Sequence, residues 1–347
     1  MILPTTYYAT LALLILGMLF LASWANTFKL ADNWRFELYY FDFVIGAMAI
    51  ATVAALTLGT LGFDGFSFRD DLLHASKKQD LYALLAGAIF NLANMLFVAA
   101  ISLSGMAVVF PVAMGSALII GVFWAYATHP QGSPVLLFAG AAIILLAVIA
   151  AAQAFKQYRL HNLDEQVRTG EVKSTRKKVS IKAVVIALIS GILMSVFYPM
   201  VQRAMEGDTG LGPYSIGFLF ALGMLLSTFL FNLFFMNLPV TGGPLEILDY
   251  FKGNIRQHLL GLAGGALWLA GMLSSLIGAT AEGPAGVSSS LAQGLTAAAA
   301  PIGALFGLSL WKEFRNAHSQ VRATLGVMLA LYVLGLVMIA VASLVGR

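Results

Sequence analysis

The sequence predicts an all-α integral membrane protein with ten transmembrane helices, arranged as two inverted five-helix repeats. Three observations support this fold class. The chain is strongly apolar, with 60% hydrophobic and 10% charged residues and a mean hydropathy of +0.87, whereas soluble domains carry about 25% charged residues. Its apolar residues fall into ten long runs, and part of the first half matches part of the second.

The ten apolar runs have the length of membrane spans, because a spanning helix needs about 20 mostly apolar residues. The expected segments are 6–27, 38–60, 81–103, 105–127, 134–155, 182–203, 213–236, 257–279, 284–310 and 321–345. The first run lacks the charged start and the cleavage site of a signal peptide, so we expect a helix that stays in the membrane. Two half-polar links, 61–80 and 237–257, are each long enough to hold a short interfacial helix.

The internal match indicates a duplication. Residues 65–109 agree with residues 243–287 at ten of 45 positions, at a constant offset of 178, and Gln79/Gln257 is one of the polar matches. Each half holds five crossings, so two copies in one chain must enter the membrane in opposite senses. Inverted repeats of this kind are typical of secondary transporters. The predicted parts are a first repeat at 1–155, a linker at 156–181 and a second repeat at 182–347.

Basic residues around the central linker set the expected orientation. The cluster comprises Lys156, Arg159, Arg168, Lys173, Arg176, Lys177, Lys178 and Lys182. Because cytoplasmic loops carry the excess of Lys and Arg, we place the linker in the cytoplasm and both termini outside, in the inner (plasma) membrane of a bacterium. A regulatory or lipid-binding role for the cluster stays open.

Several chemistries are excluded by residue type and position. The chain has no cysteine, which excludes disulfides and thiolate sites, and its five histidines fall in loops or at span ends. We therefore expect no metal site, no cofactor and no catalytic residue, and the protein is not predicted to be an enzyme. The net charge of +4 does not indicate nucleic-acid binding, because the basic residues concentrate in one loop.

Polar and aromatic residues within the spans are the candidates for binding a solute, because an unpaired polar group in lipid is costly and such residues face protein or water. The candidate set is Trp24, Asn91, Asn94, Tyr198, Gln202, Trp268, Ser290 and Gln293. Asn91 and Asn94 share one helix face and offer donors and acceptors to a neutral polar solute. The alternative for both is hydrogen bonding between helices.

The first span of each half carries an interruption or a basic end. Pro199 breaks the sixth span beside Tyr198, since proline removes a backbone donor and kinks a helix. Aligning the first and sixth spans places Trp24 on Tyr198, and it puts Lys29 and Arg203 at opposite mouths. These two cations are candidate gates, or basic residues that extend from helix ends to the interface.

Two acids near the second span are candidates for ion coupling. Glu37 lies at the start of this span and Asp42 lies within it, and we expect Lys29 to pair with one of them. The alternative is an interfacial belt of aromatic and helix-end charges. Glu282, the acid in an otherwise uncharged link, is a further candidate for a gate or coupling residue.

The tetrapeptide Trp311-Lys312-Glu313-Phe314, the two five-helix halves and the long central link resemble the drug/metabolite transporter superfamily. The run Ser23–Gly46 resembles the bacterial relatives of the plant ureide permeases, and more distantly the glucose/ribose and rhamnose porters. The fourth span ends without the acid that the ninth carries at Glu313. The resemblance implies secondary active transport of a small polar metabolite, often coupled to protons.

The sequence therefore predicts a transporter that moves a ureide, nucleobase or sugar-like metabolite by alternating access, with protons as the candidate coupling ion. The expected partners are the solute and the lipid bilayer, and the expected state is a monomer or homodimer. One alternative is an exporter of amino acids or lipophilic drugs. Another is a non-transporting sensor or assembly subunit. An intramembrane enzyme would need an acid or histidine cluster at a membrane face, which the sequence does not indicate.

Overall fold

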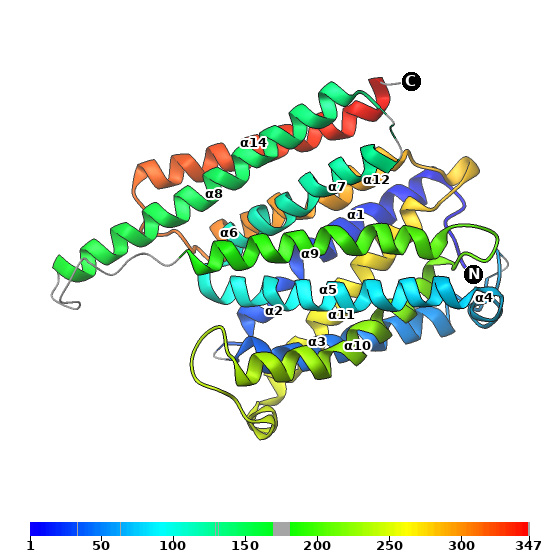
Figure 1. Cartoon of the computed structure of the whole chain (residues 1–347), viewed down its shortest axis with the longest axis horizontal. Helices are drawn as coiled ribbons and strands as arrows, with labels where there is room; N and C mark the ends of the chain where they lie inside the picture. The colour runs from blue at the N-terminus through cyan, green and yellow to red at the C-terminus, as the bar shows by residue number, and fades with distance from the viewer. Residues whose placement is uncertain (33, 63, 129, 131, 169–180, 346–347) are drawn as a thin grey trace. The chain divides into compact units, whose positions relative to one another are not determined.

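A computed structural model describes residues 1–347 except 33, 63, 129, 131, 169–180 and 346–347, and the described residues form helices and loops without strands (Figure 1). Among the described residues, ten helical stretches are long and apolar enough to cross a membrane, as predicted. They are Tyr7–Leu30, Phe36–Leu56, Lys77–Ser104, Met106–Thr128, Pro134–Leu163, Lys182–Met205, Pro213–Asn237, Ile255–Ala279, Leu291–Leu310 and Ser319–Ala342.

Two predicted boundaries differ from the structure. The ninth span starts later than residue 284, because Gly283 has φ +60 and begins a short 3-10 turn, η3 (Gly283–Ala285). The hydroxyl of Ser288 then caps the next helix, α12 (Ser289–Ala297). The fifth span continues into the predicted linker, since α8 runs over Pro134–Arg168. The basic residues Lys173, Arg176, Lys177 and Lys178 lie outside the described residues.

The helices fall into two compact units, each of which draws on both halves of the sequence. The first unit comprises Met1–Val98 and Leu193–Ala299. Its elements are α1 (Tyr7–Ser23), α2 (Ala25–Leu30), α3 (Phe36–Leu56), α4 (Phe68–His74), most of α5 (Lys77–Ser104), the second half of α9 (Lys182–Met205), α10 (Pro213–Asn237), η2 (Ile247–Lys252), α11 (Ile255–Ala279), η3 and α12. Helix α3 packs against α10 and α11, and α11 also packs against α1.

The second unit comprises Ala99–Ile192 and Ala300–Arg347. Its elements are the end of α5, α6 (Met106–Val109), η1 (Phe110–Met114), α7 (Gly115–Thr128), α8, the start of α9, α13 (Ala299–Leu305), η4 (Phe306–Leu310) and α14 (Ser319–Val345). Helices α8 and α14 form its most extensive pair (Figure 1). The predicted repeat boundaries do not follow these units and stay a prediction.

Glu313 has a structural role in the second unit. Its carboxylate accepts hydrogen bonds from the backbone N–H groups of Met106 and Ala107, both at 2.9 Å. The chain enters α6 at Gly105 with φ +85, a conformation that favours glycine. A side chain at this glycine would also collide with the Glu313 carboxylate. The acid thus satisfies N–H groups that a helix start leaves without a partner.

Close helix contacts in the first unit recur between equivalent positions. A Cβ at Gly265 of α11 would lie 1.7 Å from the carbonyl oxygen of Phe43 of α3, and a Cβ at Gly87 of α5 would lie 2.0 Å from that of Phe220 of α10. Gly87 and Gly265 are 178 residues apart, and Phe43 and Phe220 are 177 apart. Because glycine has no Cβ, both backbones can approach this closely.

Further contacts recur in the same way. A Cβ at Gly46 would lie 2.0 Å from the carbonyl oxygen of Leu262, and one at Gly223 would lie 2.1 Å from that of Leu84. These contacts again join α3 with α11 and α10 with α5. Each of the two helix pairs, α3 with α11 and α5 with α10, therefore makes close glycine contacts at two successive levels.

The polar match at Gln79 and Gln257 also makes equivalent contacts. The Gln257 amide donates to the backbone oxygen of Asp32 at 3.1 Å, and the Gln79 amide donates to that of Glu206 at 3.2 Å. Both acceptors directly follow the first span of their half. Each of the two half-polar links holds a short helix, as predicted, since α4 lies within 61–80 and η2 lies within 237–257; their position at the membrane interface stays a prediction.

Candidate functional site

An aromatic cluster occupies the interior of the first unit. The Trp268 ring of α11 stacks on the Phe90 ring of α5, with centroids 4.1 Å apart and planes at 23°. Phe220 lies 5.5 Å from Phe90, and Phe43 lies 6.5 Å from Trp268. These last two contacts are equivalent, because Phe90 corresponds to Trp268 under the internal match and Phe220 corresponds to Phe43 in the recurring glycine contacts. The stack thus joins two equivalent positions face to face.

Trp24 lies where the first span is interrupted, between α1 and α2. Its buried ring packs 5.1 Å from Phe43 and 6.0 Å from Phe97. Its carbonyl oxygen accepts from the backbone N–H and the hydroxyl of Thr27, at 3.1 and 2.7 Å. The predicted break of the sixth span at Pro199 is wrong, because α9 continues through this proline, one position after Tyr198, which corresponds to Trp24. The first span is therefore irregular at the aligned place, whereas the sixth span is a continuous helix.

The two asparagines are buried and have different partners. The Asn91 amide donates to the hydroxyls of Ser227 and Thr228 on α10, at 2.9 and 3.0 Å. The Asn94 amide donates to the Tyr40 hydroxyl at 3.2 Å. The side-chain carbonyl oxygens of both asparagines are buried and accept no hydrogen bond from the described residues. Asn91 thus links two helices, and each asparagine has a buried carbonyl oxygen without a hydrogen-bond donor among the described residues.

The other predicted binding residues do not reach this interior. Gln202 and Gln293 are exposed, and Tyr198 is 39% exposed. The side chain of Ser290 lies outside the described residues. The structure therefore gathers Trp24, Asn91, Asn94 and Trp268 within the first unit and leaves Tyr198, Gln202 and Gln293 at its surface.

The predicted gate residues at the ends of the spans lie closer to the surface. Arg203 pairs with Glu206 at 3.2 Å, and both are exposed. Glu282 is exposed at the start of η3, and Lys29 is half-buried.

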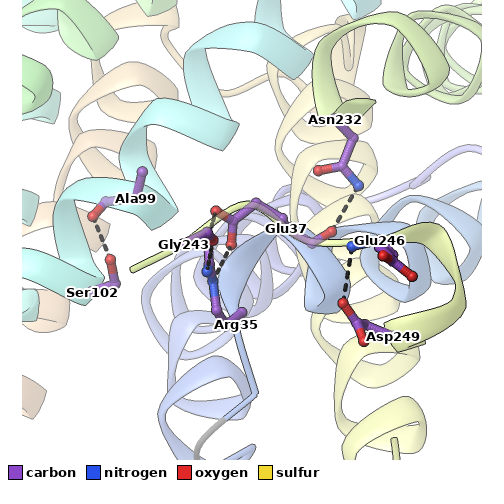
Figure 2. Close-up of polar contacts among 8 residues, drawn as sticks. All are labelled: Arg35, Glu37, Ala99, Ser102, Asn232, Gly243, Glu246 and Asp249. Carbon is purple, nitrogen blue, oxygen red and sulfur yellow. Dashed lines mark hydrogen bonds and ion pairs between the residues drawn. The ribbon is translucent and has the colours of Figure 1, made fainter. Parts of the chain in front are cut away.

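Glu37 is fully buried and is paired with Arg35. The guanidinium of Arg35 contacts both carboxylate oxygens, at 2.5 and 3.2 Å, and donates to the Gly243 carbonyl oxygen at 2.6 Å (Figure 2). The Asn232 amide of α10 donates to the backbone oxygen of Glu37 at 2.7 Å. A bidentate pair of this kind has a defined geometry and fixes the start of α3 against α10 and the loop before η2.

Asp42 is 2% exposed and contacts two residues that the sequence analysis did not select. The Tyr250 hydroxyl of η2 donates to one carboxylate oxygen at 2.5 Å, and the Nδ1 atom of His258 on α11 lies 2.9 Å from the other. Gly261 makes room for this contact, since a Cβ there would lie 2.4 Å from the Cβ of Asp42. The buried acid in an apolar run was the signal that such partners exist.

The expected pairing of Lys29 with Glu37 or Asp42 is wrong for the described residues. Glu37 takes Arg35 as its partner, two residues away along the chain, and Asp42 takes His258 and Tyr250. The prediction was wrong because Lys29 lies in the last turn of α2, whereas Asp42 is contacted from η2 and from the start of α11. Within the described residues, no group of three or more acids and histidines is arranged to hold a metal ion.

Comparisons with known proteins agree with this architecture. No family model matches the chain. The chain is similar to Ureide permease 1 of Arabidopsis thaliana, with 22% identity over an alignment of 383 positions, gaps included, that covers 96% of each protein. A solved crystal structure aligns over 99% of both chains with a TM-score of 0.55 and 15% identity, which shows a shared fold. The chain is thus an all-helical, multi-pass membrane protein with a permease-like relative.

Proposed function

We propose that the protein is a secondary active transporter, in which two inverted five-helix repeats move a small polar metabolite by alternating access. The recurring contacts carry this proposal. In the contact between Gly265 and Phe43, the glycine comes from the second half and the phenylalanine from the first. The contact between Gly87 and Phe220 joins the equivalent positions, but here the glycine comes from the first half and the phenylalanine from the second. A two-fold relation between the halves requires such an exchange. The Phe90–Trp268 stack then lies at the axis, because its members are equivalent to each other.

A two-fold axis of this kind, lying in the membrane plane, places a substrate near the middle of the bilayer where the repeats meet. The buried aromatic cluster and the asparagines lie beside the proposed axis. Of the predicted binding residues, Trp24, Asn91, Asn94 and Trp268 form the inner wall of the proposed site. In this proposal Tyr198 and Gln202 of α9, and Ser290 and Gln293 of α12, contact the solute after the repeats rearrange, with Lys29 and Arg203 near the mouths.

The substrate class follows from the relative and from the site. A ureide permease relative favours a flat, neutral solute rich in N–H groups. The free carbonyl oxygens of Asn91 and Asn94 can accept from such groups, and the stacked rings offer an apolar face. A ureide is therefore the first candidate, with nucleobases and sugars next. We place this transporter in the inner membrane of a bacterium, with protons as the coupling ion.

A binding and exchange experiment tests the proposal. Purified protein is heated with allantoin, uracil, glucose and a mixture of amino acids, because specific binding raises the melting temperature. Protein in vesicles preloaded with allantoin should then exchange external radiolabelled allantoin. We expect a thermal shift and exchange with allantoin or uracil. A protein that binds amino acids alone, or that catalyses no exchange of any of these solutes, contradicts the proposed function.

A further inference from the structure

We propose that Asp42 and His258 together form the proton-binding site of the transporter, and that the neighbouring Glu37–Arg35 pair is a fixed structural contact. This inference rests on the proposed transport function and adds the residues that carry its coupling. We assign His258 to this site because its Nδ1 atom lies 2.9 Å from the Asp42 carboxylate. Among the described residues, no lysine or arginine pairs with this carboxylate, and its other partner is the Tyr250 hydroxyl.

The position of the imidazole suits a path between water and the buried acid. The His258 side chain is 21% exposed, whereas that of Asp42 is 3% exposed. Its Nδ1 atom faces Asp42, and its Nε2 atom faces Gly253, where a Cβ would lie only 2.7 Å away. The rings of Trp34 and Tyr250 meet the imidazole edge-on, at 5.4 and 4.7 Å. The imidazole is therefore held between the buried carboxylate and the loop that contains Gly253.

The proton balance of the pair is simple. In the loaded state an imidazolium faces the Asp42 carboxylate, so the net charge is zero. On release, the Nε2–H bond breaks and the proton passes to water, while the electron pair stays on Nε2. The neutral imidazole still donates from Nδ1 to Asp42, and the site is left with one negative charge. A buried charge within a span is costly, so release destabilises the closed contact between α3 and α11.

The Glu37–Arg35 pair cannot work in this way. Arginine stays protonated in proteins, and its guanidinium holds both oxygens of Glu37. The pair is therefore a fixed contact that has no proton to exchange at the guanidinium. Imidazole, in contrast, is the side chain that ordinarily changes its charge between pH 5 and 8. The two acids of α3 differ in partner, and only Asp42 has one that exchanges protons.

The titratable groups that interact with Asp42 are Tyr250 of η2, Tyr39 of α3 and His258 of α11. The same elements also carry Asp249 and Lys252 in η2, Glu37 at the start of α3 with its partner Arg35, and Arg256 in α11. Burial, and then the hydrogen bond to Asp42, raises the pKa of Tyr250, so this phenol stays a donor. The hydrogen bond between Lys252 and Asp249 raises the pKa of the lysine and lowers that of the acid, so both stay charged.

The first test measures coupling in vesicles with allantoin and a pH-sensitive dye inside. Asp42→Asn and His258→Asn keep side chains that can hydrogen-bond across the α3–α11 contact. His258→Asn removes the imidazole that exchanges the proton, and Asp42→Asn removes the carboxylate that balances the charge of the imidazolium. We expect allantoin exchange within about twofold of the unmodified protein, and a loss of at least tenfold in accumulation driven by a proton gradient. The dye response to allantoin should vanish. His318→Asn and Asp70→Asn, exposed residues of the same types, are the matched controls and should keep coupling.

Normal gradient-driven accumulation by Asp42→Asn overturns the inference. So does a Glu37→Gln protein that exchanges allantoin but has lost coupling, because that result moves the proton site to Glu37. Absence of allantoin exchange in the unmodified protein counts against the proposed function instead, and the second test below still applies.

The second test needs no substrate. Because the chain has no cysteine, Ile45→Cys and Leu259→Cys, on exposed positions of α3 and α11, accept two unique spin labels. We expect the distance distribution between the labels to change between pH 5.5 and 8, and to become independent of pH when Asp42→Asn or His258→Asn is added. His318→Asn should retain the response. The inference is overturned if the distance distribution does not change with pH in the labelled protein that keeps Asp42 and His258. It is also overturned if the distribution still changes with pH in both Asp42→Asn and His258→Asn.

Discussion

The α3–α11 and α10–α5 interfaces share their packing and differ in their polar residues. Glycines meet carbonyl oxygens in both: Gly265 faces Phe43 in one, and Gly87 faces Phe220 in the other. The first interface holds Asp42 and His258, whereas the positions equivalent to them are Leu219 and Asp80. The repeated frame thus carries a carboxylate–imidazole contact on one side only.

The α10–α5 interface carries a different set of polar residues, at the depth of Asn91. Asn91 bonds Ser227 and Thr228 there, and its equivalent across the repeat is Leu269. Matched glycines keep the helices close in both interfaces, whereas the polar residues differ between the two interfaces. In the proposed transporter, one interface binds the coupling ion and the other helps to bind the solute.

Removal of Arg35 should have the largest effect on stability. Arg35→Ala leaves the fully buried Glu37 without its cation, and loss of one partner of a buried pair costs about 3–5 kcal/mol. We expect a large fall in the melting temperature of the purified protein. Arg203→Ala, which breaks an exposed pair, should cost about 1 kcal/mol or less. Equal effects of the two changes would contradict the distinction between the fixed pair and the surface pair.

Alanine at the matched glycines tests the shared packing. Gly265→Ala and Gly87→Ala each force a Cβ against a backbone oxygen, and overpacking of this kind costs about 1–3 kcal/mol. We expect similar losses at the two sites in thermal unfolding. Gly121→Ala is the control, since its Cβ would meet nothing within 4 Å. If one of the matched glycines tolerates alanine as well as Gly121 does, the two interfaces are not equivalent.

Apolar replacement at Asn94 tests the solute side of the comparison. Asn94→Leu removes a buried acceptor and should weaken allantoin affinity about tenfold, as expected for one lost hydrogen bond of about 1.4 kcal/mol. Calorimetric titration measures this change. Met272→Leu, at the equivalent position of α11, should leave the affinity within about twofold. Weaker binding in both variants would indicate a general disturbance of the core.

The matched glutamines should give the smallest effects. Gln79→Ala removes the hydrogen bond to the backbone oxygen of Glu206. Gln257→Ala removes the equivalent bond to Asp32 and also the bond that its side-chain oxygen accepts from the Asn254 N–H at the start of α11. We expect a cost of about 0.5–1 kcal/mol at Gln79 and a larger cost at Gln257, where a helix cap is lost as well, in thermal unfolding. A cost at one site alone would show that the two contacts are not equivalent in solution.

Much of the fold could be predicted from the sequence, because span length and apolarity are local properties. The ten spans and the short helices α4 and η2 follow from them. The offset of 178 selected Gly87/Gly265 and Gln79/Gln257, whose contacts recur. The late start of α12 was missed because Gly283 adopts a positive φ, which local apolarity does not indicate.

The site was harder to predict, because partners of a buried acid come from distant parts of the chain. Asp42 is separated from His258 by 216 residues, and no pattern along the chain joins them. The sequence marked Asp42 correctly as buried, and it favoured Lys29 as a partner by proximity. Tyr198, Gln202 and Gln293 share helices with the site, but helix membership alone does not decide which side chains turn inward.

The central claim, that the halves are inverted, is tested most directly by labelling two equivalent positions. Lys78 and Arg256 are 178 residues apart, exposed, and located at the starts of α5 and α11. In this cysteine-free chain, Lys78→Cys and Arg256→Cys each provide one target for a membrane-impermeant maleimide. In intact cells we expect labelling of Lys78→Cys from outside, and labelling of Arg256→Cys only after the membrane is opened. Labelling of both from the same side would contradict the inverted repeat.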